Sequence, residues 1–148
     1  MKFRVATIED IPQIHAVRTA VTENRLSDPN LITTDDYISF LTERGQGWVC
    51  EVDKRIVGFA VVDVWEDNVW ALFLLPGYEG NGIGKELQRL MLDWFFTRGK
   101  DYIWLGTSPG TRAATFYRMT GWQEVGCHGE KEIKFELTKE NWMKRQAL

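Results

Sequence analysis

The sequence has few cysteines and histidines and no long apolar run. Its two cysteines are far from each other, and so are its two histidines, and the chain shows neither a disulfide framework nor the ligand spacing of a metal site. We therefore expect no metal, and we expect Cys50 and Cys127 to be buried free thiols. The apolar stretch at residues 69–75 is far shorter than the ~18 residues of a membrane span, and no signal-like segment opens the chain. These absences predict a cytoplasmic protein with no membrane partner.

A dense basic cluster is also missing. The 18 lysines and arginines are outnumbered by 21 aspartates and glutamates, which gives a net charge of -3 and argues against nucleic acid as a partner. With 44% hydrophobic residues, the 148-residue chain has the composition of a globular protein and the length to bury one core. No linker or repeat divides it. We expect a single domain over residues 1–148.

The first half of the chain predicts one strand, two helices and a three-strand meander. A strand at residues 3–6 precedes a helix that Thr7 and Asp10 open as a capping box, with an apolar face of Ile11, Ile14, Val17 and Val21. A polar loop at residues 24–33 leads to a second helix ending at Gly45. Strands follow at 48–52, 56–65 and 69–75. The last has no internal polar side chain, which predicts a central strand covered on both faces.

The second half alternates helices and strands. Apolar residues three and four apart predict a helix from residue 83, and a strand at 102–107 parallel to 69–75 follows it. A short helix at 112–120 and a strand pair at 122–127 and 132–137 come next. The tail from Thr138 is interpreted as either a docked helical turn or a frayed end. The predicted fold class is α/β, with a single mixed, mostly antiparallel sheet flanked by helices.

A glycine-rich turn joins the strand at 69–75 to the following helix. Glycines at alternate positions allow positive φ and close approach of a ligand, while the first N–H groups of the helix lack partners and attract anions. The spacing excludes the dinucleotide fingerprint, which needs glycine at Lys85 or Leu87, and the G-x-x-x-x-G-K-[ST] loop, which needs glycine at Glu79. On its own, G-x-G-x-G is equally consistent with a phosphate site and with a plain structural turn.

Two motifs together resemble the GNAT acetyltransferase superfamily over nearly the whole chain. The turn from Glu79 to Gly84 is similar to [QR]-x-x-G-x-[GA], and residues 110–122 are similar to N-x-x-A-x-x-F-Y-x-x-x-G-F. Glu79 and Gly110 depart from these patterns. The resemblance implies acetyl-CoA as the co-substrate, held along the strand and by the turn. The implied cofactor-binding residues are Leu72, Phe73, Leu74, Gly80, Asn81, Gly82, Ile83, Gly84, Lys85 and Phe116.

The resemblance also implies direct transfer of acetyl to a small-molecule or peptide amine. Tyr117 would protonate the leaving thiolate, since a phenol is protonated at neutral pH. A main-chain N–H of Leu74 or its neighbour would hold the thioester oxygen. The general base stays open: Asp63, Glu66 and Asp67 are candidates but have the pattern of solvated turn residues.

Several alternatives remain at this level. Trp65, Trp70 and Trp104 are either an acceptor pocket or core packing, and Arg25 and Arg112 are either substrate contacts or solvated charges. The departures at Glu79 and Gly110 keep open a catalytically inactive acyl-CoA-binding module. Edge strands would also allow a homodimer.

Overall fold

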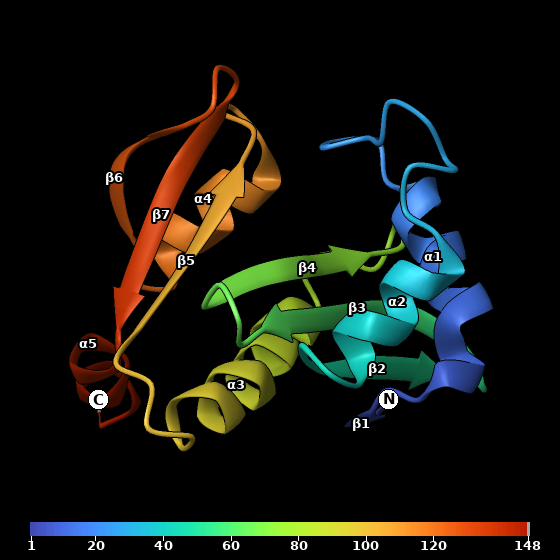
Figure 1. The fold of residues 1–148 in the computed structure, drawn as a ribbon, viewed down its shortest axis with the longest axis horizontal. Helices are drawn as coiled ribbons and strands as arrows, with labels where there is room; N and C mark the ends of the chain where they lie inside the picture. Colours follow the sequence, from blue (N-terminus) through green and yellow to red (C-terminus); the bar gives the residue numbers. More distant parts are fainter. Residues whose placement is uncertain (148) are drawn as a thin grey trace.

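A computed structural model describes residues 1–147 and shows one seven-stranded sheet with helices on its faces (Figure 1). The spatial order is β1-β2-β3-β4-β5-β7-β6, and only the β4–β5 pair is parallel. The predicted fold class is therefore confirmed. The strands are β1 (Lys2–Val5), β2 (Gly45–Val52), β3 (Arg55–Asp63), β4 (Asn68–Leu74), β5 (Tyr102–Thr107), β6 (Gln123–His128) and β7 (Glu132–Thr138).

Five α-helices and a short 3-10 turn complete the described chain. They are η1 (Ile8–Asp10), α1 (Ile11–Ala20), α2 (Thr34–Leu41), α3 (Ile83–Phe96), α4 (Arg112–Met119) and α5 (Lys139–Gln146). Strand alternation shows which face some of them cover. On one face, a β-carbon at Gly58 of β3 would contact Leu87 of α3. Val61 of β3 points to the opposite face, because successive side chains of a strand alternate. On that face, a β-carbon at Gly47 of β2 would contact both Val61 and Leu41 of α2. The sheet core is thus enclosed between α2 and α3. Within residues 1–147, no helix combines the length and apolar character of a membrane span.

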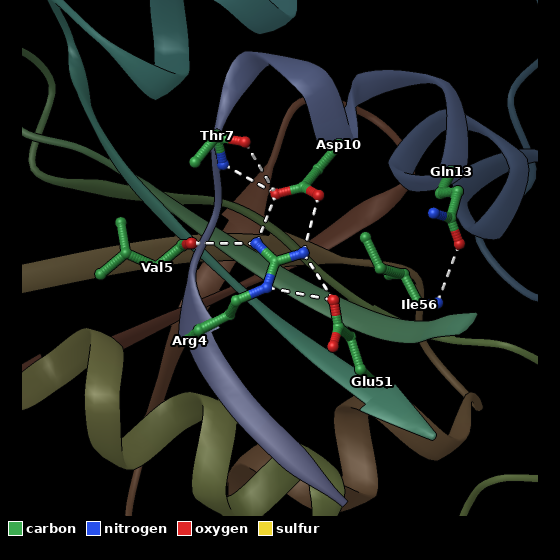
Figure 2. A network of polar contacts seen from close by, with 7 residues as sticks. All are labelled: Arg4, Val5, Thr7, Asp10, Gln13, Glu51 and Ile56. Carbon is green, nitrogen blue, oxygen red and sulfur yellow. Dashed lines mark hydrogen bonds and ion pairs between the residues drawn. The ribbon is translucent and has the colours of Figure 1, made fainter. Parts of the chain in front are cut away.

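Arg4 fixes the start of the chain to the sheet (Figure 2). Its guanidinium donates to both carboxylate oxygens of Asp10, at 2.7 and 2.8 Å, and to Glu51 of β2 at 2.7 Å. Asp10 also accepts from the Thr7 N–H at 2.8 Å, so the predicted capping contact between these two residues is present. This network locks η1 and the first turn of α1 onto β1 and β2.

Strands β4 and β5 separate after a single residue pair. Asn68, the first residue of β4, pairs with Trp104 in the middle of β5. The β3–β4 register shifts where Val62 pairs with Val69 while Val61 pairs with Ala71, which leaves Trp70 as an extra residue on β4. Such a bulge bends and twists its strand. Figure 1 shows the carboxyl-terminal halves of β4 and β5 diverging, and this opening positions the candidate site.

Several expected boundaries and exposures differ from the structure. The second helix ends at Leu41 rather than Gly45, because Gly45 already pairs in β2, where a β-carbon would lie 1.7 Å from the Val62 carbonyl oxygen. The first four residues of β4 alternate between half-buried and buried, and its last three, residues 72–74, are all half-buried, whereas β3 is covered along nearly its whole length. The prediction of full cover for β4 was wrong because one of its edges borders the opening.

Two further predictions concern the end of the chain. Cys50 is a buried free thiol as expected, but Cys127 is exposed, because it lies on the sheet-edge strand β6. The tail forms α5, which is docked rather than frayed. Trp142 is buried, and its indole N–H donates to Asp93 of α3 at 3.1 Å.

Candidate functional site

A cleft of about 880 Å³ lies where β4, the glycine turn and α4 meet. It is large enough for a sizeable ligand, because drug-sized pockets hold roughly 300–1,000 Å³. All the cofactor-binding residues predicted above line it except Asn81, which is exposed. Those lining it are Leu72, Phe73, Leu74, Gly80, Gly82, Ile83, Gly84, Lys85 and Phe116.

The glycine turn presents an open backbone to this cleft. Gly80 and Gly82 have φ values of 80° and 81°, and no atom would lie within 4 Å of a β-carbon on either. Gly82 is the N-cap of α3 and supplies no capping side chain, so the first N–H groups of the helix are left for an anion. Gly84 differs from the prediction of positive φ: it lies inside α3. The Phe116 ring lies 3.6 Å from where its β-carbon would be.

The free edge of β4 supplies main-chain donors. The Leu75 N–H donates to the Val57 carbonyl on β3 at 2.8 Å. Successive amides of a strand point in opposite directions, so the N–H groups of Leu74 and Leu72 point away from β3, toward the side where β5 has diverged. Such edge groups can pair with an extended ligand arm.

Tyr117 lies at the border between the cleft and a second cavity. It is 5% exposed, and its ring packs against Phe116, Trp122 and Phe135 at centroid distances of 5.3 to 6.0 Å. Burial raises the pKa of Tyr117 well above its usual value, so the hydroxyl carries its proton at neutral pH. Within residues 1–147 this hydroxyl has no hydrogen-bond partner. It is a proton donor held next to a space that a ligand can enter.

Gln88 fixes the position of α4 relative to α3. Its buried side-chain oxygen accepts from the Trp122 indole N–H at 2.9 Å, and the Trp122 ring packs on Tyr117. Thr120 donates to the same oxygen at 3.4 Å. Trp122, at the position of the last phenylalanine in the motif that residues 110–122 resemble, therefore supplies a hydrogen bond that ties the tyrosine-bearing segment to the helix of the glycine turn.

The second cavity, of about 280 Å³, adjoins the cleft on the other side of Tyr117. Tyr117, Leu72, Phe73, Ala113 and Asn24 line both spaces. We call it the acceptor cavity. Its wall includes Trp70, which stacks on Phe40 with centroids 4.0 Å apart, and Tyr37, whose hydroxyl is 2.8 Å from His15 Nδ1. Burial raises the pKa of Tyr37 to about 12.

Of the residues left open by the sequence, Arg25 and Trp70 line the acceptor cavity and Arg112 lines the cleft. Trp65 is 60% exposed, and the Trp104 indole N–H donates to the Glu66 carbonyl. These two tryptophans line neither cavity.

The three acidic candidates for a base also lie outside both cavities. Asp63 is buried in an ion pair with Arg44 rather than solvated, and Asp67 pairs with Lys100 at 2.7 Å. Both therefore have structural partners. Glu132 is the carboxylate that lines the acceptor cavity.

Sequence reasoning missed Arg18, Asn24 and the cavity role of Tyr37. Arg18 follows Ile11 by seven residues and Ile14 by four, so it lies along the apolar face of α1. Val21, which was expected on the same face, is instead the extended residue that follows the helix. A charge on an otherwise apolar helix face is the signal that could have identified Arg18.

Comparisons with known proteins agree with this geometry. The model of the acetyltransferase (GNAT) family matches residues 11–122. An uncharacterized N-acetyltransferase of Mycobacterium tuberculosis is 32% identical over 110 residues, which are 67% of this chain and 66% of that protein. One of Methanocaldococcus jannaschii is 29% identical over 101 residues, covering 60% and 44%. The chain thus spans two thirds or less of the length of these relatives.

Solved structures share the fold at low sequence identity. The PaiA N-acetyltransferase of Thermoplasma acidophilum, in complex with coenzyme A, superposes with a TM-score of 0.78 at 15% identity, over 93% of this chain and 99% of that one. The ribosomal-protein-alanine N-acetyltransferase of Brucella melitensis gives 0.71 at 20% identity, over 94% and 99%. The family match covers more than half of the chain and contains the glycine turn and the Phe116-Tyr117 segment. This chain belongs to the acetyltransferase (GNAT) family.

Proposed function

We propose that this chain is an N-acetyltransferase that transfers the acetyl group of acetyl-CoA directly to an amine of a small molecule or peptide. The observation that carries the proposal is the position of Tyr117, a protonated phenol that borders both the large cleft and the acceptor cavity. Family membership and the coenzyme A complex of the Thermoplasma neighbour support the choice of cofactor.

The residues of the cleft suit two parts of acetyl-CoA, its pyrophosphate and its pantetheine arm. The open backbone at Gly80 and Gly82 and the start of α3 would hold the pyrophosphate, with Lys85 adding positive charge. The edge of β4 would pair with the pantetheine arm through Leu72 and Leu74. This arrangement directs the thioester toward Tyr117.

The transfer forms a carbon–nitrogen bond and breaks the carbon–sulfur bond of the thioester. The Leu74 N–H would stabilise the negative charge that develops on the thioester oxygen. The acceptor would first lose one proton to solvent, because its ammonium form has no lone pair, and the nitrogen would lose a second proton to solvent as the amide forms. Tyr117 would give its proton to the departing sulfur and would then regain a proton from solvent. Burial favours the neutral phenol, so the proton is in place when the thiolate forms.

Thiol release from acetyl-CoA across a panel of amines tests the proposal. We expect turnover that falls about 100-fold or more in kcat for Tyr117→Phe, because general acid catalysis contributes typically 10²–10⁴-fold. Tyr102→Phe is the matched control, since the Tyr102 hydroxyl bonds Glu136 and lines neither cavity. Tight coenzyme A binding without turnover of any amine would instead identify a catalytically inactive acyl-CoA-binding module.

A melting experiment separates acetyl-CoA from other phosphate ligands. At a ligand concentration about 100 times Kd, selective binding to the folded state adds roughly 2.7 kcal/mol of stability. We expect acetyl-CoA to raise Tm, and ATP and NAD to leave it unchanged. Equal shifts with ATP or NAD would point to a different nucleotide.

A further inference from the structure

Arg18 is a half-buried cation in the wall of the acceptor cavity, and part of its guanidinium is fully buried. It lies in the last turn of α1, and its Nη1 atom is inaccessible to solvent with no hydrogen-bond partner among residues 1–147. None of the ion pairs found in that range includes Arg18. A buried, unpaired guanidinium N–H is costly, so a native structure that keeps one calls for an explanation.

The contact that Arg18 does make leaves its N–H groups free. Its guanidinium carbon lies 4.1 Å above the centre of the Phe73 ring, on β4. This cation–π contact involves the charge of the guanidinium and uses none of its N–H donors in a hydrogen bond. Phe73 thereby holds Arg18 at the cavity wall while its N–H groups stay available to a ligand.

The charge around Arg18 favours an anion. The acceptor cavity is lined by two cations, Arg18 and Arg25, and by one carboxylate, Glu132. A guanidinium edge matches a carboxylate with two parallel hydrogen bonds, and this geometry is the reason that arginine is used at such sites. The remaining wall is largely apolar and aromatic, with Ile32, Tyr37 and Trp70.

We propose that Arg18 binds a carboxylate of the acceptor, so that the acceptor class is a small amine that also carries a carboxylate and an apolar side group. The inference rests on the proposed acetyltransferase function, because it assigns the substrate of that same site. Tyr117 lines the same cavity, so one molecule can place its carboxylate at Arg18 and its amine at the thioester. At about 280 Å³, the cavity suits one amino-acid-sized group rather than a long peptide segment.

Matched pairs of amines test this assignment. Thiol release is measured with amino acids whose amine and carboxylate are one to four carbons apart, among them phenylalanine and leucine, and with the corresponding carboxamides. We expect the best acids to exceed their amides in kcat/KM by about 10- to 100-fold, since hydrogen bonds to charged groups contribute roughly 1.5–3 kcal/mol. Arg18→Gln should remove this preference through KM, and Arg18→Lys should restore part of it.

Arg98→Gln is the matched control, because Arg98 makes the same kind of ring contact, 4.4 Å from the Trp94 centre, yet lines neither cavity. It should leave the preference intact.

Calorimetric binding of the acids to coenzyme A-saturated protein adds a readout that needs no turnover. Binding that Arg18→Gln abolishes would support the assignment even if no amine is acetylated, and would then count against the proposed catalysis alone. Equal use of acids and amides, an equal loss for both in Arg18→Gln, or no binding of any acid would overturn it.

Discussion

At the scale of single residues, Glu79 places a negative charge beside the glycine turn. Glu79 lines the cleft, and its carboxylate accepts a hydrogen bond from the Gly77 N–H at 2.9 Å. The Arg112 guanidinium lies 3.7 Å from the same carboxylate oxygen. Both contacts reduce the repulsion that a negative side chain would exert on a bound phosphate, and both groups are exposed enough for water and salt to screen what remains.

We predict that Glu79→Gln leaves coenzyme A affinity equal or raises it by up to about fivefold. Glutamine keeps an oxygen for the Gly77 N–H and removes the charge, and exposed charge interactions are worth roughly 0.2–1 kcal/mol. Isothermal titration at low and high salt measures the change, which should shrink as salt rises. Glu86→Gln serves as a comparison, because Glu86 already pairs with Arg89. A marked loss of affinity would reveal a direct role for the Glu79 carboxylate.

Local sequence identified some site residues and could not identify others. Tyr117 and the turn residues stand in short motifs, so their shared location could be predicted. Arg18 and Tyr37 reach the acceptor cavity from two different helices, and only the packing of these helices on β4 brings them together. Cys127 was misassigned because an apolar context in sequence does not say whether a strand lies at the edge of the sheet.

At the scale of elements, contacts between residues far apart in the sequence determine geometry that local sequence patterns predict only in part. The Thr7 and Asp10 pattern predicted the start of the first helix, and the Thr7 N–H does donate to Asp10. The partners of Arg4 were not predictable, because the contact with Glu51 depends on the register in which β1 pairs with β2. The bulge at Trp70, beyond which β4 no longer pairs with β5, is likewise not indicated by the uninterrupted apolar run.

The Arg4 network makes stability depend on pH. Hydrogen bonds from Arg4, and from the Thr7 N–H, lower the pKa of Asp10 below its usual value. A carboxylate whose folded-state pKa is depressed adds stability that is complete above its unfolded pKa, about 3.9, and is lost as pH falls through the lower folded-state value. The contribution is therefore present at neutral pH and disappears in acid.

We predict that Asp10→Asn destabilises the protein by about 1–3 kcal/mol at pH 7, because it weakens a half-buried charged hydrogen bond. The difference from the wild type should stay constant down to about pH 5 and become smaller below pH 4, as the wild-type carboxyl gains its proton. Urea denaturation at pH 7, 5 and 3 measures it. A difference that is unchanged at pH 3 would show that the charge of Asp10 is not what stabilises this corner.

At the scale of the whole molecule, α3 joins the two halves of the sheet. The halves share a single β4–β5 residue pair, so other contacts must hold the cleft to its width. Two buried tryptophans from the second half reach α3: Trp122 bonds Gln88, and Trp142 bonds Asp93. The sequence predicted the sheet and its helices, but it left the last helix open, because the role of Trp142 depends on where α5 docks.

We predict that Trp142→Ala destabilises the protein by about 3–5 kcal/mol, since it empties a buried aromatic site and leaves Asp93 without the indole N–H. Because α5 ties the second half of the sheet to the helix of the glycine turn, the same change should weaken coenzyme A binding, although Trp142 does not line the cleft. Urea denaturation and calorimetric titration measure the two effects.

Trp65→Ala is the matched control: Trp65 is 60% exposed and lines neither cavity, so the change should shift stability by about 1 kcal/mol or less and leave affinity unchanged. If Trp142→Ala lowered stability while affinity stayed at the wild-type value, the cleft would be held by the Gln88–Trp122 bond without help from α5.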